Sequence, residues 1–181
     1  MAQHRDSARE TILTAFQELL IDTSGTGASL DEVARRAGVT KGGLLYHFAS
    51  RRLLEAALMD RLELLAAEDY QLAKEAPEGA AVRYVALAEY LNSPLDRVTI
   101  AVGTLAAQDE RARGILSEVR QRNFEILNDD LGDAALARAT MLIADGMYYE
   151  AATTIEPFEH ELDVTAFLRR MIATKPASTD S

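Results

Sequence analysis

Two short stretches with helical spacing of apolar residues are separated by only three residues, Gly38-Val39-Thr40. The first stretch, residues 30–37, follows Ser29, and the second, residues 41–48, follows Thr40, so each begins after a residue that commonly caps a helix. Glycine is favoured just past the end of a helix because it adopts the left-handed conformation easily. Two helices joined by so tight a turn predict a helix-turn-helix, whose second helix enters the major groove of DNA by its N-terminal end.

The N-terminal end of that second helix has the composition of a DNA-reading surface, Thr40-Lys41-Gly42-Gly43. Threonine can donate its hydroxyl to a phosphate, and lysine can reach either a phosphate or the acceptor edge of guanine. The two glycines each lower helix propensity by about 1 kcal/mol relative to alanine. Close approach of the backbone to the bases would explain that cost.

Further groups that can hold phosphate follow in the next turns: Tyr46, His47, and the pair Arg51-Arg52. Ser50 can cap a long helix to about residue 74, and the free amides at its start add to an anion site. The alternative for each group taken alone is a solvated face or ordinary packing in a helical hairpin.

The remainder of the chain shows helical periodicity and no sustained alternation of apolar and polar residues. We therefore predict an all-α fold of about nine helices: three short helices, a long linking helix and five longer helices. The expected domains are a helix-turn-helix domain over 1–49, a second helical domain over 50–173, and a disordered tail over 174–181. Ser7, with Glu10 three residues later, is expected to cap the first helix.

Charge divides the chain in the same way. Residues 1–53 hold seven basic and six acidic residues, a net charge of +1, whereas residues 54–181 have a net charge of −11. Together they give the total charge of −10. DNA would tolerate the first part and repel the second, although an acidic surface can also serve solubility alone. The chain has no cysteine, which excludes thiolate metal sites and disulfides. No apolar run is long enough for a membrane helix and no signal core is present, so we expect a cytoplasmic protein without a membrane partner.

The segment from Ser29 to Leu54, with the helix before it and the start of the helix after it, resembles the DNA-binding region of the TetR family of transcriptional repressors. The resemblance covers about residues 7–60. It implies an N-terminal three-helix DNA-binding domain, a homodimer on a palindromic operator, and a C-terminal domain that binds a small-molecule effector and so releases DNA. It also implies roles in DNA binding for a set of residues: Ser29, Thr40, Lys41, Gly42, Gly43, Tyr46, His47 and Arg51.

Two positions depart from the family pattern. Gly43 stands where the family often has threonine, and Leu45 stands where it often has tyrosine. A similar helix occurs in members that sense multiple drugs or dyes, which points to that branch.

For the expected dimer, the helix over 134–154 is the best candidate interface because it is rich in small residues and apolar on most faces. The last helix, over 159–173, would complete a four-helix interface; a core helix of a monomer is the alternative. Asp145 lies within this apolar helix, where it is either a structural hydrogen-bonding group or the anion of a pocket for a lipophilic cation. The other candidate wall residues are Met59, Tyr84, Tyr90, Phe124, Met147, Tyr148 and Tyr149.

Other functions fit less well. The three histidines, His4, His47 and His160, form no metal-ligand spacing and no catalytic triad. We therefore expect no enzyme, no metal and no cofactor. A DNA-binding regulator or activator without a small-molecule ligand, controlled by a partner, remains the alternative to a ligand-responsive repressor.

Overall fold

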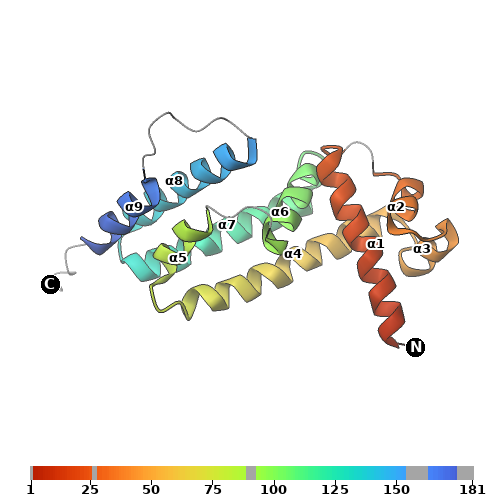
Figure 1. Cartoon of the computed structure of the whole chain (residues 1–181), viewed down its shortest axis with the longest axis horizontal. Coiled ribbons are helices and arrows are strands. Elements are labelled where there is room, and N and C mark those ends of the chain that lie inside the picture. Colours follow the sequence, from red (N-terminus) through yellow and green to blue (C-terminus); the bar gives the residue numbers. More distant parts are fainter. Residues whose placement is uncertain (1, 26–27, 89–92, 154–162, 175–181) are drawn as a thin grey trace. The chain divides into compact units, whose positions relative to one another are not determined.

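The computed structural model describes residues 2–25, 28–88, 93–153 and 163–174, and within these ranges all regular structure is α-helical. The predicted all-α fold is confirmed (Figure 1). The nine helices of the described ranges are α1 (Ala2–Asp22), α2 (Leu30–Ala37), α3 (Lys41–His47), α4 (Arg51–Lys74), α5 (Ala80–Leu87), α6 (Pro94–Leu105), α7 (Glu110–Leu131), α8 (Ala134–Thr153) and α9 (Val164–Ala173). None of the helices in these ranges is long and apolar enough to cross a membrane.

The described structure falls into two compact units. The first unit comprises Met1–Ala66 and Pro94–Glu118, and the second comprises Ala67–Ser93 and Val119–Ser181. The first unit therefore contains residues 1–49 together with α6 and parts of α4 and α7. The functional boundary after residue 49 stays a prediction.

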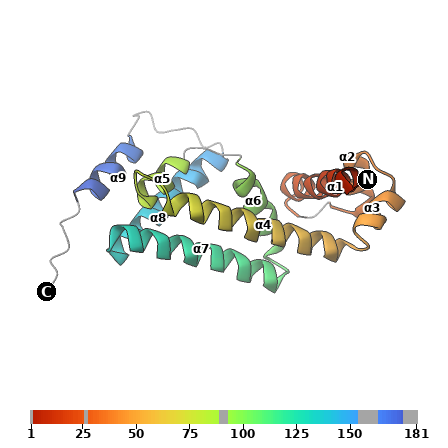
Figure 2. The same cartoon turned by 90° about the horizontal axis from the view of Figure 1, so that it is seen from below.

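In the first unit, α1 packs against both α2 and α6, and α2 packs against α3 (Figures 1 and 2). The buried face of α1 is apolar and has helical spacing, with Ile12, Leu13, Phe16 and Leu20 at 1% exposure or less. Burial of such side chains contributes roughly 2 kcal/mol each. This core fixes the position of the helix-turn-helix.

The predicted cap of the first helix is wrong. Ser7 lies inside α1, where its carbonyl oxygen accepts a hydrogen bond from the hydroxyl of Thr11. Glu10, the expected partner in a capping box, instead forms an ion pair with Arg61 of α4. No glycine or proline precedes Ser7 to end the helix, so the helix extends to Ala2.

In the second unit, α5 packs against α8 and α9. The core cluster consists of Ala81, Leu127, Leu131, Ala137 and Met141. The start of α5 is held from α7, because the backbone amide of Ala81 donates to Asp130 Oδ2 at 2.8 Å.

Some of the predicted limits fall in gaps of the described chain. Helix α5 ends at Leu87, and residues 89–92 lie outside the described residues. The two helices expected at the dimer interface are described only in part, because Thr154 and residues 159–162 lie outside the described residues. Most of the tail expected to be disordered lies outside them as well. Within the described part α9 begins after Asp163, whose carboxylate accepts from the amide of Ala166 at 2.6 Å.

Candidate nucleic-acid interface

The turn between α2 and α3 has the predicted geometry. Gly38 adopts a left-handed conformation with φ of 68°, and its amide donates to the carbonyl oxygens of Ala34 and Arg35. Thr40 caps α3, since its Oγ1 accepts from the amide of Gly43 at 3.0 Å. A hydroxyl that accepts through its oxygen keeps its hydrogen as a donor. The exposed Thr40 hydroxyl can therefore donate to a phosphate while it caps the helix.

Helix α3 has one buried face and one exposed face. Leu44 is fully buried and Phe48, at the C-cap, is 2% exposed, so these two side chains anchor the helix. The exposed face consists of Lys41, Gly42, Leu45 and Tyr46. This face offers one cation, one aromatic hydroxyl and a stretch of bare backbone.

The two glycines of α3 differ in their surroundings. A Cβ on Gly42 would have Thr40 Oγ1 as its nearest neighbour, at 4.0 Å, which is ordinary contact. A Cβ on Gly43 would lie only 3.3 Å from the same oxygen. Gly43 therefore leaves space for the Thr40 cap, whereas no close contact within the protein requires a glycine at position 42.

Tyr46 is the most exposed aromatic side chain of this region, at 66%. Its ring meets the ring of His47 edge to face, with centroids 5.2 Å apart and planes at 83°. His47 is partly buried. Tyr46 therefore combines a solvent-exposed ring and hydroxyl with a ring contact to its neighbour on α3.

Ser29 is engaged within α2. Its Oγ accepts from the Glu32 amide at 3.3 Å and its own amide donates to Glu32 Oε2 at 3.1 Å, which together make a capping box. The Ser29 hydroxyl also donates to Glu32 Oε2 at 2.6 Å. The hydrogen bonds from Ser29 lower the pKa of the Glu32 carboxyl. Ser29 can donate to a phosphate only if it releases Glu32.

Arg51 is also engaged. Its Nε donates to Glu55 Oε1 at 2.8 Å and its Nη1 donates to the carbonyl oxygen of Ala28 at 2.9 Å. The guanidinium lies over the ring of Phe16, 5.9 Å from the centroid. Arg51 thus links the start of α4 to the segment before α2. The neighbouring Arg52 is exposed.

The sequence did not indicate one charged residue that lies beside α3. Asp31, in the first turn of α2, accepts from Lys41 Nζ at 2.9 Å. Both side chains are exposed, Lys41 at 56% and Asp31 at 70%. The ten-residue separation across a turn gave no sequence signal for this pair.

The structure brings together some of the candidate effector residues. Tyr84 and Phe124 both pack against the core cluster of the second unit. Burial, with a further contribution from nearby Asp145, raises the pKa of Tyr84 to about 12. Asp145 itself accepts from Arg120 Nη2 at 2.6 Å, so its charge is already paired.

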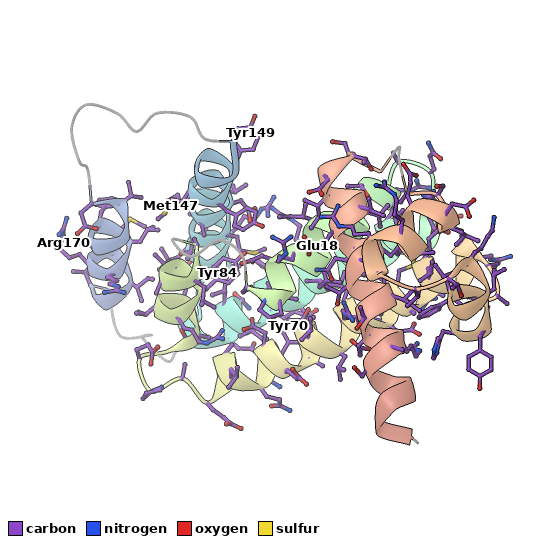
Figure 3. All side chains as sticks on the ribbon, turned by 45° about the vertical axis from the view of Figure 1, so that its right-hand side comes forward. Glu18, Tyr70, Tyr84, Met147, Tyr149 and Arg170 are labelled. Carbon is purple, nitrogen blue, oxygen red and sulfur yellow. The ribbon has the colours of Figure 1, made fainter. Side chains whose placement is uncertain are left out.

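The other candidates are more scattered. Met59 is 2% exposed and belongs to the core of the first unit, and Tyr90 lies outside the described residues. Met147 and Tyr148 are partly buried on α8. Tyr149 is 63% exposed and projects from the last turns of α8 (Figure 3).

The geometry of α2, the turn and α3 defines a helix-turn-helix protein whose second helix, α3, has an exposed face. Residues 12–58 match the family model for bacterial regulatory proteins of the tetR family. The resemblance inferred from the sequence is therefore confirmed for this segment, which matches the DNA-binding region of TetR-family transcriptional regulators.

Relatives match over the same part of the chain. The transcriptional activator FasR of Mycolicibacterium smegmatis is 40% identical over 57 residues, which cover 32% of this chain and 26% of FasR. The transcriptional regulator SrpR of Pseudomonas putida is 34% identical over 61 residues, which cover 33% of this chain and 29% of SrpR. The matched segment thus spans less than a third of either relative.

Solved structures match over nearly the whole chain. SCO7518 of Streptomyces coelicolor A3(2), assigned as a transcriptional regulator, is 26% identical with a TM-score of 0.61, and the match covers 92% of this chain and 96% of SCO7518. The multidrug binding protein EbrR in complex with imidazole is 24% identical with a TM-score of 0.58, and the match covers 95% of this chain and 98% of EbrR. The likeness to EbrR shows a shared fold.

Proposed function

We propose that the protein is a ligand-responsive transcriptional repressor that binds a palindromic operator as a homodimer in the cytoplasm. The observation that carries this proposal is the exposed face of α3, where Lys41 and Tyr46 flank the bare backbone of Gly42. A helix that exposes its N-terminal face in this way can lie in the major groove and bring the backbone close to the bases.

The dimer is supported by apolar side chains on α8 and α9. Leu142 and Tyr149 are 53% and 63% exposed, and a separation of seven residues places them on the same face of α8. Phe167 of α9 is 49% exposed. We propose that these faces pair with their copies about a two-fold axis, as a palindromic operator requires.

We propose that the effector binds the second unit near Tyr84, Phe124 and Asp145. A lipophilic cation could stack on the aromatic rings and approach the carboxylate. The same fold in EbrR has been solved with proflavin and with ethidium, which supports testing such compounds. Because Arg120 already pairs with Asp145, a cation would have to displace that guanidinium or bind beside the neutral pair.

In this mechanism the effector must bind one state of the dimer more tightly than the other. The state it favours would alter the direction of α4 and so the separation of the two reading helices. The two helices would then no longer fit successive major grooves.

A regulator or activator without a small-molecule ligand is the second candidate. The internal neutralisation of Asp145 by Arg120 favours it, because the one carboxylate expected to attract a cation is already satisfied. The relative FasR is named as an activator. Control would then come from a partner protein.

Fluorescence anisotropy with duplex DNA from immediately upstream of the gene, compared with a scrambled duplex, tests the proposal. We expect saturable binding to the upstream duplex, reversed by at least one compound from a panel of cationic dyes. Arg120→Met should tighten binding of that dye by exposing Asp145, whereas the exposed Arg138→Met should leave it unchanged.

Each outcome separates the parts of the proposal. Binding that no compound reverses would favour the partner-controlled regulator. Equal affinity for both duplexes would contradict an operator upstream of the gene. Reversal by anionic acyl thioesters and not by cationic dyes would overturn the assigned effector class.

A further inference from the structure

The ion pair between Lys41 and Asp31 lies at the surface that the proposed function assigns to DNA. Lys41 is the first residue of α3, and Asp31 is the second residue of α2, so the pair joins the N-terminal ends of both helices of the motif. The Nζ–Oδ2 distance is 2.9 Å, and both side chains are more than half exposed. A strong donor and a strong acceptor therefore stand side by side on this surface.

We propose that Lys41 and Asp31 act as one unit that reads a G·C base pair, with Asp31 as a specificity-determining residue. In the major groove, guanine presents N7 and O6 as acceptors and cytosine presents its N4 amino group as a donor. A thymine–adenine pair also places an acceptor beside a donor, but thymine has a methyl group where guanine has N7, so a lysine that reaches both acceptors favours guanine. O6 and N4 are hydrogen-bonded to each other, so they lie about 2.9 Å apart. The spacing of Nζ and Oδ2 matches this edge, with Lys41 donating to guanine and Asp31 accepting from cytosine.

The charge of the pair favours contact with a base edge over contact with the phosphate backbone. A lone lysine binds any phosphate, because the phosphate backbone attracts cations without regard to sequence. Asp31 neutralises Lys41 and would repel phosphate from the same place. The pair therefore disfavours the backbone and favours a base edge that offers both a donor and an acceptor.

A purely local role for Asp31 is the competing explanation, since a carboxylate in the first turn of a helix is favourable. The chain offers a matched pair for this comparison. Arg36 Nη1 and Asp22 Oδ2 are 2.6 Å apart, with side chains 39% and 52% exposed. Arg36 is in the last turn of α2, at the opposite end of that helix from Asp31.

The inference rests on the proposed function and is tested by selection with the full chain. The wild type, Asp31→Asn and Asp22→Asn are each incubated with a library of random duplexes, and the bound duplexes are sequenced. Affinities are then measured by anisotropy for the enriched duplex, for single base-pair variants of it, and for an unrelated duplex. Thermal melting of each variant checks that it is folded.

For the wild type we expect one G·C pair in each half-site whose replacement by A·T weakens binding roughly 5- to 150-fold, the range for one good base contact. In Asp31→Asn that penalty should fall at least about threefold, and affinity for the unrelated duplex should rise several-fold because a negative charge has been removed. Asp22→Asn should retain the wild-type penalty.

Two results would overturn the inference while leaving the proposed function intact: an Asp31→Asn variant with the wild-type penalty at every position, or equal losses in Asp31→Asn and Asp22→Asn. A wild type that enriches no sequence would overturn the proposed function and the inference with it.

Discussion

Arg97 of α6 holds Glu18 of α1 through its guanidinium, with Nε donating to Oε1 at 2.9 Å and Nη2 contacting Oε2. The two residues are 79 positions apart in the sequence. Their side chains are 32% and 22% exposed, so the pair is largely shielded from solvent. A helix from the middle of the chain is thereby attached to the first helix of the DNA-binding region.

This pair predicts a measurable coupling in stability. Arg97→Met should destabilise the first unit by about 2 kcal/mol, because it leaves a poorly solvated carboxylate unpaired. The double variant with Glu18→Gln should recover part of this loss. A thermodynamic cycle from urea unfolding should give a coupling of about 1 kcal/mol, and a coupling near zero would show that the two side chains do not stabilise each other.

Gly42→Ala should separate stability from DNA binding. The added Cβ meets nothing closer than 4.0 Å, so helix propensity should raise stability by about 0.5–1 kcal/mol. The methyl group would lie on the DNA-facing surface and should weaken DNA binding by about tenfold. Gly114→Ala, in α7, also has open space and is the control, with raised stability and unchanged DNA affinity. Unchanged DNA affinity in Gly42→Ala would contradict close backbone approach at this position.

The capping box of α2 should give an acid-dependent contribution to stability. Since the pKa of Glu32 is lowered below its usual 4.5 in the folded protein, its contribution is present above about pH 4.5 and is lost as pH falls through the folded value. The wild type should therefore be more stable than Glu32→Gln at pH 7, and the difference should shrink at pH 3. Urea midpoints at both pH values measure this difference. The exposed Glu68→Gln serves as control, and a difference that stays constant with pH would contradict the prediction.

Tyr84 should give the opposite dependence at alkaline pH. Its pKa is raised from 10 to about 12 by burial and by the negative charge of Asp145, so the folded state favours the neutral phenol. The corresponding stability is present below pH 10 and is lost between pH 10 and 12, with a magnitude of about 2 kcal/mol.

Tyr84→Phe removes this titration, so the variant should lose less stability than the wild type between pH 9 and 11.5. Replacing an exposed tyrosine, in Tyr46→Phe, should leave the loss as large as in the wild type. Parallel loss in the wild type and Tyr84→Phe would show that the phenol does not control alkaline unfolding.

Local signals in the sequence predict the helix-turn-helix well. Ser29, Gly38 and Thr40 have short-range effects on the backbone, and the structure places each at the expected helix end. The family match covers the same region, residues 12–58. Ser7 has the same local signal and fails, because a helix already in progress overrides a capping motif.

Contacts between distant residues could not be read in this way. The carbonyl oxygen of Ala28, 23 residues before Arg51, binds a guanidinium that the family pattern assigns to phosphate. The pairing of Asp145 with Arg120 depends on how α7 and α8 pack, which spacing along one helix does not reveal. The burial of Met59 in the core of the first unit likewise depends on tertiary packing, so the sequence did not predict it.

The affinity of Tyr46→Ala for the upstream duplex tests whether the exposed face of α3 binds DNA. Tyr46 is 66% exposed, so the substitution should leave folding intact. Leu64→Ala, at a side chain 60% exposed on α4, is the matched control. We expect at least about a tenfold higher Kd for Tyr46→Ala and an unchanged Kd for Leu64→Ala. Wild-type affinity in Tyr46→Ala would contradict the assignment of this face as the DNA-binding surface.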